Sequence, residues 1–109
     1  MNVFDEREKA FEAKYQLDQE TAFKVNVRRD KLLGLWVAGK IGLSGSAAEE
    51  YARSVIEADF AEPGDDDVVR KILADLANRK VELSEHDVRL EMHRLTAVAR
   101  QQVLTEAGK

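Results

Sequence analysis

The segment from residue 34 to residue 41 comes closest to a site that could do chemistry, because it nearly matches the P-loop that binds nucleotide phosphates. Gly34, Gly39 and Lys40 have the required spacing, but Ile41 replaces the hydroxyl residue that binds magnesium. A P-loop must also follow a strand, whereas this segment belongs to the most apolar helical stretch of the chain. We therefore interpret it as part of a buried helix.

Residue types that bind metals occur in two places. His86 and His93 would share a helix face but lie two turns, or roughly 10 Å, apart, which is too far for one zinc ion with ligands at about 2 Å. Residues 65–67 are all aspartate, but a calcium loop beginning there would need glycine and glutamate where the chain has Arg70 and Leu76. A helix N-terminus, whose dipole favours carboxylates, explains the aspartates. We predict no metal site.

Nucleophilic catalysis has no better support. The serines have no G-x-S-x-G context, and three of them stand where helix caps are expected. The sequence shows no paired general acid and base. We predict that the chain has no catalytic residues, requires no cofactor and is not an enzyme. The serines in question are Ser44, Ser46, Ser54 and Ser84.

The composition indicates a small helical domain that acts by binding another molecule. The chain has 109 residues, 44% hydrophobic and 35% charged, with a net charge of −4 and no cysteine. The net negative charge repels nucleic acid, no apolar run is long enough to span a bilayer, and the N-terminus has no apolar signal core. We expect a cytoplasmic protein without disulfides, without a nucleic-acid partner and without membrane insertion.

Glycine, proline and capping residues divide the chain into helices. The break at residues 42–45 ends a first helix. A second helix begins with Ser46 in a capping box, or with Ser44 as the cap, and residues 62–64 stop it near Phe60. Its apolar residues at helical spacing, which we expect to be buried, are Tyr51, Ala52, Val55, Ile56 and Phe60.

Two further helices follow. The third is capped by Asp65 or Asp66, and the fourth begins with Ser84 and Asp87 as a capping pair. Because short connections favour antiparallel neighbours, we predict an all-α four-helix bundle for residues 21–109. The residues expected to be buried are Val68, Val69, Ile72, Leu73 and Leu76 in the third helix, and Val88, Met92, Leu95, Ala99 and Val103 or Gln102 in the fourth.

The first forty residues have two different characters. Residues 32–37 are apolar almost all round, so we expect this stretch, including Trp36, to be deeply buried. Residues 1–20 are mostly charged, and their three aromatics lie within about 40° of one another on a helix. Such a stripe is typical of an interface anchor, or of a longer first helix that packs on the bundle, and the residues alone leave both open. The three aromatics are Phe4, Phe11 and Tyr15.

Several runs of the sequence resemble the zeta inhibitor subunit of the bacterial F-type ATP synthase. The likeness covers essentially the whole chain, and the two N-terminal runs together are quite specific. The chain departs from the resemblance at Asp30, where we expect asparagine or a similar residue, and at Gly39, where we expect a residue that favours a helix. The similar runs are residues 4–15, 28–36, 42–45, 58–60, 63–68 and 81–88.

The resemblance implies a bundle with a mobile, partly helical N-terminal segment, residues 1–20, that blocks ATP hydrolysis. The segment would insert into the catalytic head beside the central shaft, so the implied partners are the alpha, beta and gamma subunits. The free protein would be a monomer and would reach the membrane only through the ATP synthase. The residues implied to bind the partner are Phe4, Arg7, Glu8, Phe11, Lys14 and Tyr15.

The resemblance also implies that the bundle binds ADP or ATP as a regulatory ligand. We expect the phosphates to meet Arg28, Arg29 or Lys31 and the base to pack near Trp36. This basic run is otherwise explained as a solvated helix face. A different class of function stays open, namely a helical homo-oligomer or scaffold whose first twenty residues form its own interface.

Overall fold

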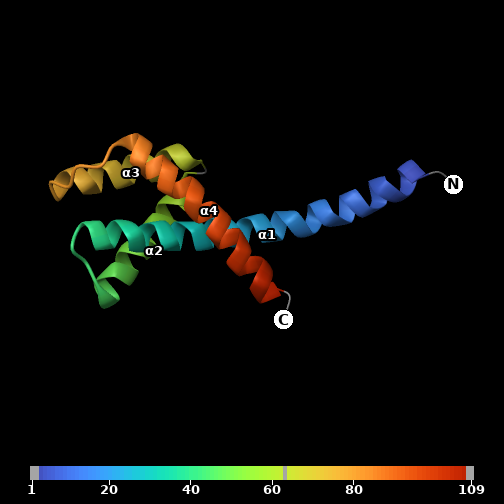
Figure 1. Ribbon diagram of the computed structural model, residues 1–109, viewed down its shortest axis with the longest axis horizontal. Helices are drawn as coiled ribbons and strands as arrows, with labels where there is room; N and C mark the ends of the chain where they lie inside the picture. Colours follow the sequence, from blue (N-terminus) through green and yellow to red (C-terminus); the bar gives the residue numbers. More distant parts are fainter. Residues whose placement is uncertain (1–2, 63, 108–109) are drawn as a thin grey trace.

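The computed structural model contains four helices joined by short connections (Figure 1). It describes the backbone of residues 3–62 and 64–107, and the side chains of residues 19–62 and 64–106. Over that part of the chain no strand occurs, so the predicted all-α class with four helices is confirmed. The helices are α1 (Val3–Lys40), α2 (Gly45–Ala61), α3 (Asp65–Asn78) and α4 (Glu85–Ala107).

Two helix ends lie where the capping pattern predicted them. After α1, Gly42 has a φ of +84°, and the N–H of Leu43 donates to the carbonyl of Ala38 at 2.8 Å, as in a Schellman motif. Before α4, the N–H of Ser84 donates to the Asp87 carboxylate at 3.2 Å, and the N–H of Asp87 donates to the Ser84 hydroxyl at 3.0 Å. These bonds to Ser84 lower the pKa of Asp87.

Two predicted helix starts differ from the structure. α2 begins directly after Ser44, which is its N-cap, so the alternative with Ser44 is correct and Ser46 lies inside the helix. α3 begins after Gly64, which has a φ of +129°. Asp65 and Asp66 therefore lie in the first turn and not at the cap. Glycine is the N-cap because this position has a positive φ, which residues with a Cβ rarely adopt. The carboxylates of Asp65 and Asp66 still lie at the positive end of the helix dipole.

The main hydrophobic core lies where the four helices meet, and a smaller cluster joins α1 to the C-terminal half of α4. The inner faces follow the spacing of three and four residues that the sequence predicted. The main core contains Leu33, Val37, Val55, Val68, Val69, Ile72, Leu76, Val88, Met92 and Leu95. The smaller cluster contains Val25, Ala99 and Val103.

Three aromatic residues are less buried than predicted, among them Tyr51, which is only partly buried against the core. Phe60 is 57% exposed. It follows the last buried residue of α2, Val55, by more than a turn and stacks on Phe23 of α1 instead of entering the core, with ring centroids 5.7 Å apart. Trp36 is half-buried, because Leu33 and Val37 take the inner positions of α1 and leave it at the core's edge.

Helices α1 and α2 cross closely at a pair of small residues. Gly34 is buried, and a Cβ placed there would lie 2.5 Å from the Cα of Ala52, which is inside contact distance. Gly39, one and a half turns further along α1, is exposed and has no atom within 4 Å of the same position. Gly34 thus allows the close contact between α1 and α2, whereas Gly39 makes no such contact.

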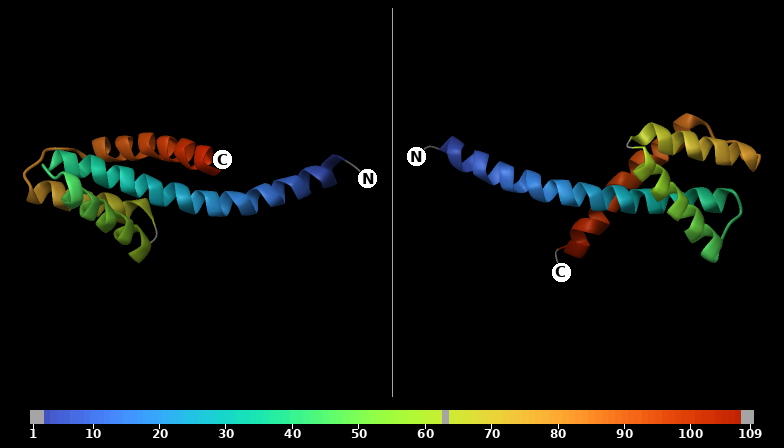
Figure 2. Two further views of the ribbon diagram at one scale, coloured as in Figure 1. Left: turned by 90° about the horizontal axis from the view of Figure 1, so that it is seen from below. Right: turned by 180° about the vertical axis from the view of Figure 1, so that it is seen from behind.

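Helix α1 is longer than the bundle that it belongs to. Its N-terminal half extends away from the other three helices in each view (Figures 1 and 2), and the molecule measures 63 × 28 × 23 Å. The boundary predicted between residues 20 and 21 falls inside this helix, so continuous helical backbone joins the two parts. Over the described residues, none of the helices has both the length and the apolar character needed to cross a bilayer.

Candidate interaction site at the base of the long helix

All the residues predicted to bind a partner belong to α1, but the structure describes the side chains of that helix only over residues 19–40, which we call its base. Its described side chains begin at Gln19, and the predicted mobility of residues 1–20 stays a prediction. The side chains that lie outside the described residues include Phe4, Arg7, Glu8, Phe11, Lys14 and Tyr15.

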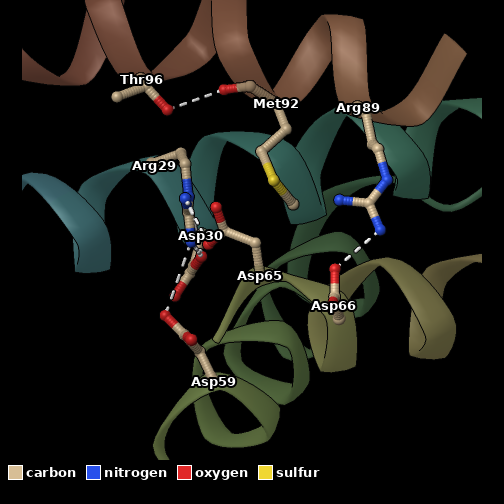
Figure 3. A network of polar contacts seen from close by, with 8 residues as sticks. All are labelled: Arg29, Asp30, Asp59, Asp65, Asp66, Arg89, Met92 and Thr96. Carbon is tan, nitrogen blue, oxygen red and sulfur yellow. Dashed lines mark hydrogen bonds and ion pairs between the residues drawn. The ribbon is translucent and has the colours of Figure 1, made fainter. Parts of the chain in front are cut away.

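A buried ionic cluster fastens α1 to α2 and α3 (Figure 3). Arg29 is 5% exposed and Asp30 is fully buried. The Arg29 guanidinium lies 2.9 Å from an oxygen of Asp30 and 2.9 Å from an oxygen of Asp65. It also lies 3.6 Å from an oxygen of Asp59. Carboxylates from three helices therefore surround one guanidinium.

The surroundings of this cluster raise the pKa values of both Asp30 and Arg29. Burial raises the pKa of Asp30 to about 8, and a hydrogen bond with Asp59 adds to the rise, while the positive charge of Arg29 opposes it. Burial acts to lower the pKa of Arg29, but the Asp30 and Asp65 carboxylates outweigh it and raise that pKa, so the guanidinium stays charged. Within the described residues, Oδ2 of Asp30 is buried and has no hydrogen-bond donor.

A second contact fastens α1 to the end of α4. Arg28 donates hydrogen bonds to Gln102 at 2.8 Å and to both carboxylate oxygens of Glu106 at 2.8 and 2.7 Å. The Glu106 side chain is 57% exposed, so the ion pair contributes at most about 1 kcal/mol. Its bidentate geometry nevertheless fixes the direction of the guanidinium.

A groove of about 410 Å³ lies between α1 and α4 beside this contact. The Phe23 ring at its edge stacks on Phe60 with an angle of 3° between the ring planes. A flat aromatic surface next to cationic side chains is a combination that can stack a base and neutralise phosphates. The groove is lined by Thr21, Phe23, Lys24, Val27, Arg28, Lys31, Val103 and Glu106.

The four residues predicted to bind nucleotide do not form one site. Arg28 and Lys31 line the groove. Arg29 is buried, with its guanidinium bound by carboxylates. Trp36 lies eight positions after Arg28, roughly 12 Å along the helix, with the Lys40 ammonium 5.6 Å from its ring centroid. The structure thus brings two of the four together.

Sequence reasoning missed the aromatic edge of this groove. The basic run that contains Lys24 was visible in the sequence, but Phe23 and Phe60 come from different helices far apart in the chain. No local pattern pairs them, because their stacking depends on how α2 crosses α1. Exposure of both rings, at 58% and 57%, is the structural signal that marks the surface.

The residues that first suggested metal chemistry have other surroundings. His86 and His93 are both exposed on α4. Asp66 accepts a hydrogen bond from Arg89 at 2.8 Å, and Asp67 accepts one from Arg70 at 2.9 Å. In the part of the chain that the structure describes, no group of three or more histidine and acidic side chains is placed to hold a metal ion.

Comparison with known proteins gives a family and a related structure. The model of a family described as ATPase inhibitor subunit zeta matches residues 1–102 of the chain. A solution NMR structure is 46% identical in sequence, with a TM-score of 0.68, over 77% of this chain and 95% of that chain. No match was found among curated proteins.

Proposed function

The chain belongs to the ATPase inhibitor subunit zeta family, and from this premise we propose that it blocks ATP hydrolysis by inserting its N-terminal segment into the catalytic head of the F-type ATP synthase. The family supports an inhibitor that associates with the ATP synthase and has no catalysis of its own. The insertion, the alpha, beta and gamma partners and the contact residues are our proposal. So are a monomeric free protein and its place in the cytoplasm beside the membrane-bound enzyme.

The single observation that carries the insertion mechanism is the length of α1. The helix runs from Val3 to Lys40 without a break, and its first half extends beyond the bundle (Figure 2). Residues 3–20 of a helix span roughly 27 Å, which is long enough to reach into a crevice between subunits. The predicted stripe of Phe4, Phe11 and Tyr15 would supply the anchors, since aromatic residues dominate binding energy at interfaces.

The experiment measures ATP hydrolysis by the catalytic head with increasing amounts of the purified protein. We expect inhibition by the full chain and none by a chain that lacks residues 1–17. Phe11→Ala removes the central anchor of the stripe and should cost about 2 kcal/mol or more of binding energy, which is roughly a thirtyfold loss of affinity. Glu8→Ala and Lys14→Ala, at the rim of the stripe, should act more weakly.

A matched control is available on the bundle. Phe60→Ala removes the same side chain type from an exposed position on α2, and we expect it to inhibit like the parent. Circular dichroism of each variant should report an unchanged bundle. Full inhibition by Phe11→Ala, or by the truncated chain, would place the inhibitory surface on the bundle and refute the insertion mechanism. Light scattering of the free protein tests the scaffold alternative, which requires an oligomer.

We further propose that the groove between α1 and α4 binds an adenine nucleotide as a regulatory ligand. The supporting observation is the aromatic edge formed by Phe23 beside Lys24, Arg28 and Lys31. In this arrangement the base stacks on Phe23 and the phosphates meet the three cations. The arrangement assigns no contact to Trp36, in contrast to the sequence-based expectation.

Titration with ADP and ATP while recording backbone amide shifts tests this ligand site. We expect the largest shifts around Phe23 and Lys31, and weaker binding by Lys24→Ala and Phe23→Ala. Trp36→Phe serves as the control, because it changes the residue that the sequence favoured and the groove does not contain. Shifts centred on Trp36 would restore the sequence-based site, and a complete absence of shifts would end the nucleotide proposal.

A further inference from the structure

The buried cluster around Arg29 contains more negative than positive groups. One guanidinium faces the carboxyls of Asp30, Asp59 and Asp65. The Asp65 side chain is 56% exposed and is solvated, but those of Asp30 and Asp59 are only 1% and 14% exposed. Because two enclosed carboxylates in contact repel each other and lose hydration, the pair is more stable with one proton than with none.

The hydrogen bonds indicate which oxygen carries that proton. Oδ1 of Asp30 accepts two hydrogen bonds from Arg29, from Nε at 3.2 Å and from a terminal nitrogen at 2.9 Å. Oδ2 is buried without a hydrogen-bond partner, and the Asp59 carboxyl acts on Asp30 through a side-chain hydrogen bond. An ionised carboxylate can only accept, so two carboxylates form a hydrogen bond only when one is protonated. A proton on Oδ2 of Asp30 satisfies both groups.

We propose that Asp30 keeps a proton in the folded protein and donates it from Oδ2 to the Asp59 carboxylate, and that this hydrogen bond is a latch between α1 and α2 that opens when the proton leaves. At alkaline pH the proton passes to solvent and leaves the two enclosed groups, Asp30 and Asp59, both as carboxylates beside one guanidinium. Water must then enter between the helices to hydrate them. The latch lies at the base of the proposed inhibitory segment, so its effect on inhibition, though not its titration, rests on the proposed function.

The titration of Asp30 is governed by few neighbours. Burial raises its pKa to about 8, close to the pH at which cells work. Arg89 of α4, also drawn in Figure 3, binds Asp66 at 2.8 Å. The charged groups that act on Asp30 are Arg29 of α1 and Asp59 of α2. Asp65 of α3 binds the same guanidinium, and the uncharged Met92 and Thr96 of α4 are drawn in the same view (Figure 3).

Carboxyl-detected NMR of the full-length protein tests the proton directly. The side-chain carboxyl carbon of Asp30 should titrate with a midpoint near pH 8, and its signal should be lost in Asp30→Asn. A midpoint below pH 5 would overturn the proposal, because the carboxyl would then be ionised in the neutral folded protein. The experiment requires no partner, so it is independent of the proposed function.

Hydrogen exchange tests whether loss of the proton opens the latch. In the parent, amides of residues 26–34 should exchange at least tenfold faster at pH 9 than at pH 7, after correction for intrinsic base catalysis. Asp30→Asn keeps an N–H donor for Asp59 but cannot ionise, so its corrected rates should stay constant. Asp66→Asn makes the same change at an exposed position and should behave like the parent. Equal pH dependence in the parent and Asp30→Asn would overturn the latch.

Inhibition of ATP hydrolysis by the same proteins tests the consequence. Between pH 7 and pH 9 the parent should lose at least threefold in inhibitory potency relative to Asp30→Asn, a ratio in which the pH dependence of the head itself cancels. If both proteins inhibit equally at both pH values, the latch does not regulate inhibition and that part is overturned. If neither inhibits at any pH, the proposed function fails, while the NMR titration still decides where the proton lies.

Discussion

Adding one methyl group at Gly34 should destabilise the whole bundle, although the same change stabilises most helices. The new Cβ would lie 2.5 Å from the Cα, 3.0 Å from the Cβ and 3.3 Å from the backbone nitrogen of Ala52. A backbone atom cannot rotate away, so α1 and α2 must separate along their contact. Forced overpacking of this kind typically costs about 1–3 kcal/mol.

The gain in helix propensity offsets part of this cost. Alanine is favoured over glycine inside a helix by about 1 kcal/mol. We therefore expect Gly34→Ala to be less stable than the parent by up to about 2 kcal/mol. Each kcal/mol corresponds to a shift of roughly 4–8 °C in Tm for a domain of this size.

Gly39→Ala is the matched control for this prediction. Gly39 lies on the same helix, is exposed, and has no atom within 4 Å of the added methyl group. Only the propensity change remains there, so this variant should gain up to about 1 kcal/mol. Thermal and urea unfolding followed by circular dichroism measure both differences. If Gly34→Ala and Gly39→Ala shift Tm in the same direction by similar amounts, the close crossing of α1 and α2 is wrong.

Three further substitutions test individual contacts. Ser84→Ala removes the cap of α4 and should cost about 1 kcal/mol in unfolding experiments, and a neutral result would mean that the bonds with Asp87 do not stabilise the helix. Lys80→Gly relieves the strain of a positive φ, +58°, and should raise the free energy of unfolding by up to about 1 kcal/mol. The measurement is Tm, and a lower Tm would contradict this. The parent should lose stability relative to Asp30→Asn as pH rises from about 4 to 8, by at most about 1.4 kcal/mol per unit. Below pH 4 both states of the parent are protonated at Asp30, and above pH 8 both are ionised, so the difference should level off at each end.

The sequence was sufficient to predict where the helices end, because those ends depend on local chemistry. Gly42 and the pair of Ser84 and Asp87 act within a few residues of the backbone groups that they satisfy. The start of α3 shows the limit of such reasoning. Glycine and aspartate are both common N-cap residues, so the sequence allows either Gly64 or Asp65 as the cap. Only the backbone path of the preceding loop decides that it is Gly64.

The site at the base of α1 was harder to predict because it depends on contacts between helices. Charged residues are rarely fully buried unless they are paired, so a sequence alone places Arg29 and Asp30 at the surface. Their burial follows from Asp59 and Asp65, which α2 and α3 bring alongside α1. The resemblance to a family marked Asp30 as a departure, yet it gave no reason to expect a buried proton there.

The two fastenings of α1 lie on opposite sides of the helix and within one turn. Arg28 and Asp30 are two residues apart, which places them about 160° from each other around the axis. Arg28 binds the end of α4, while Asp30 meets Asp59 of α2. The N-terminal half of α1 continues from these two contacts as one helix, so a small rotation of the helix there would displace its N-terminal end by many ångströms. A nucleotide that competes for Arg28 would therefore act on one side of α1, and a proton that leaves Asp30 would act on the other. Both would change the direction in which the proposed inhibitory segment leaves the bundle.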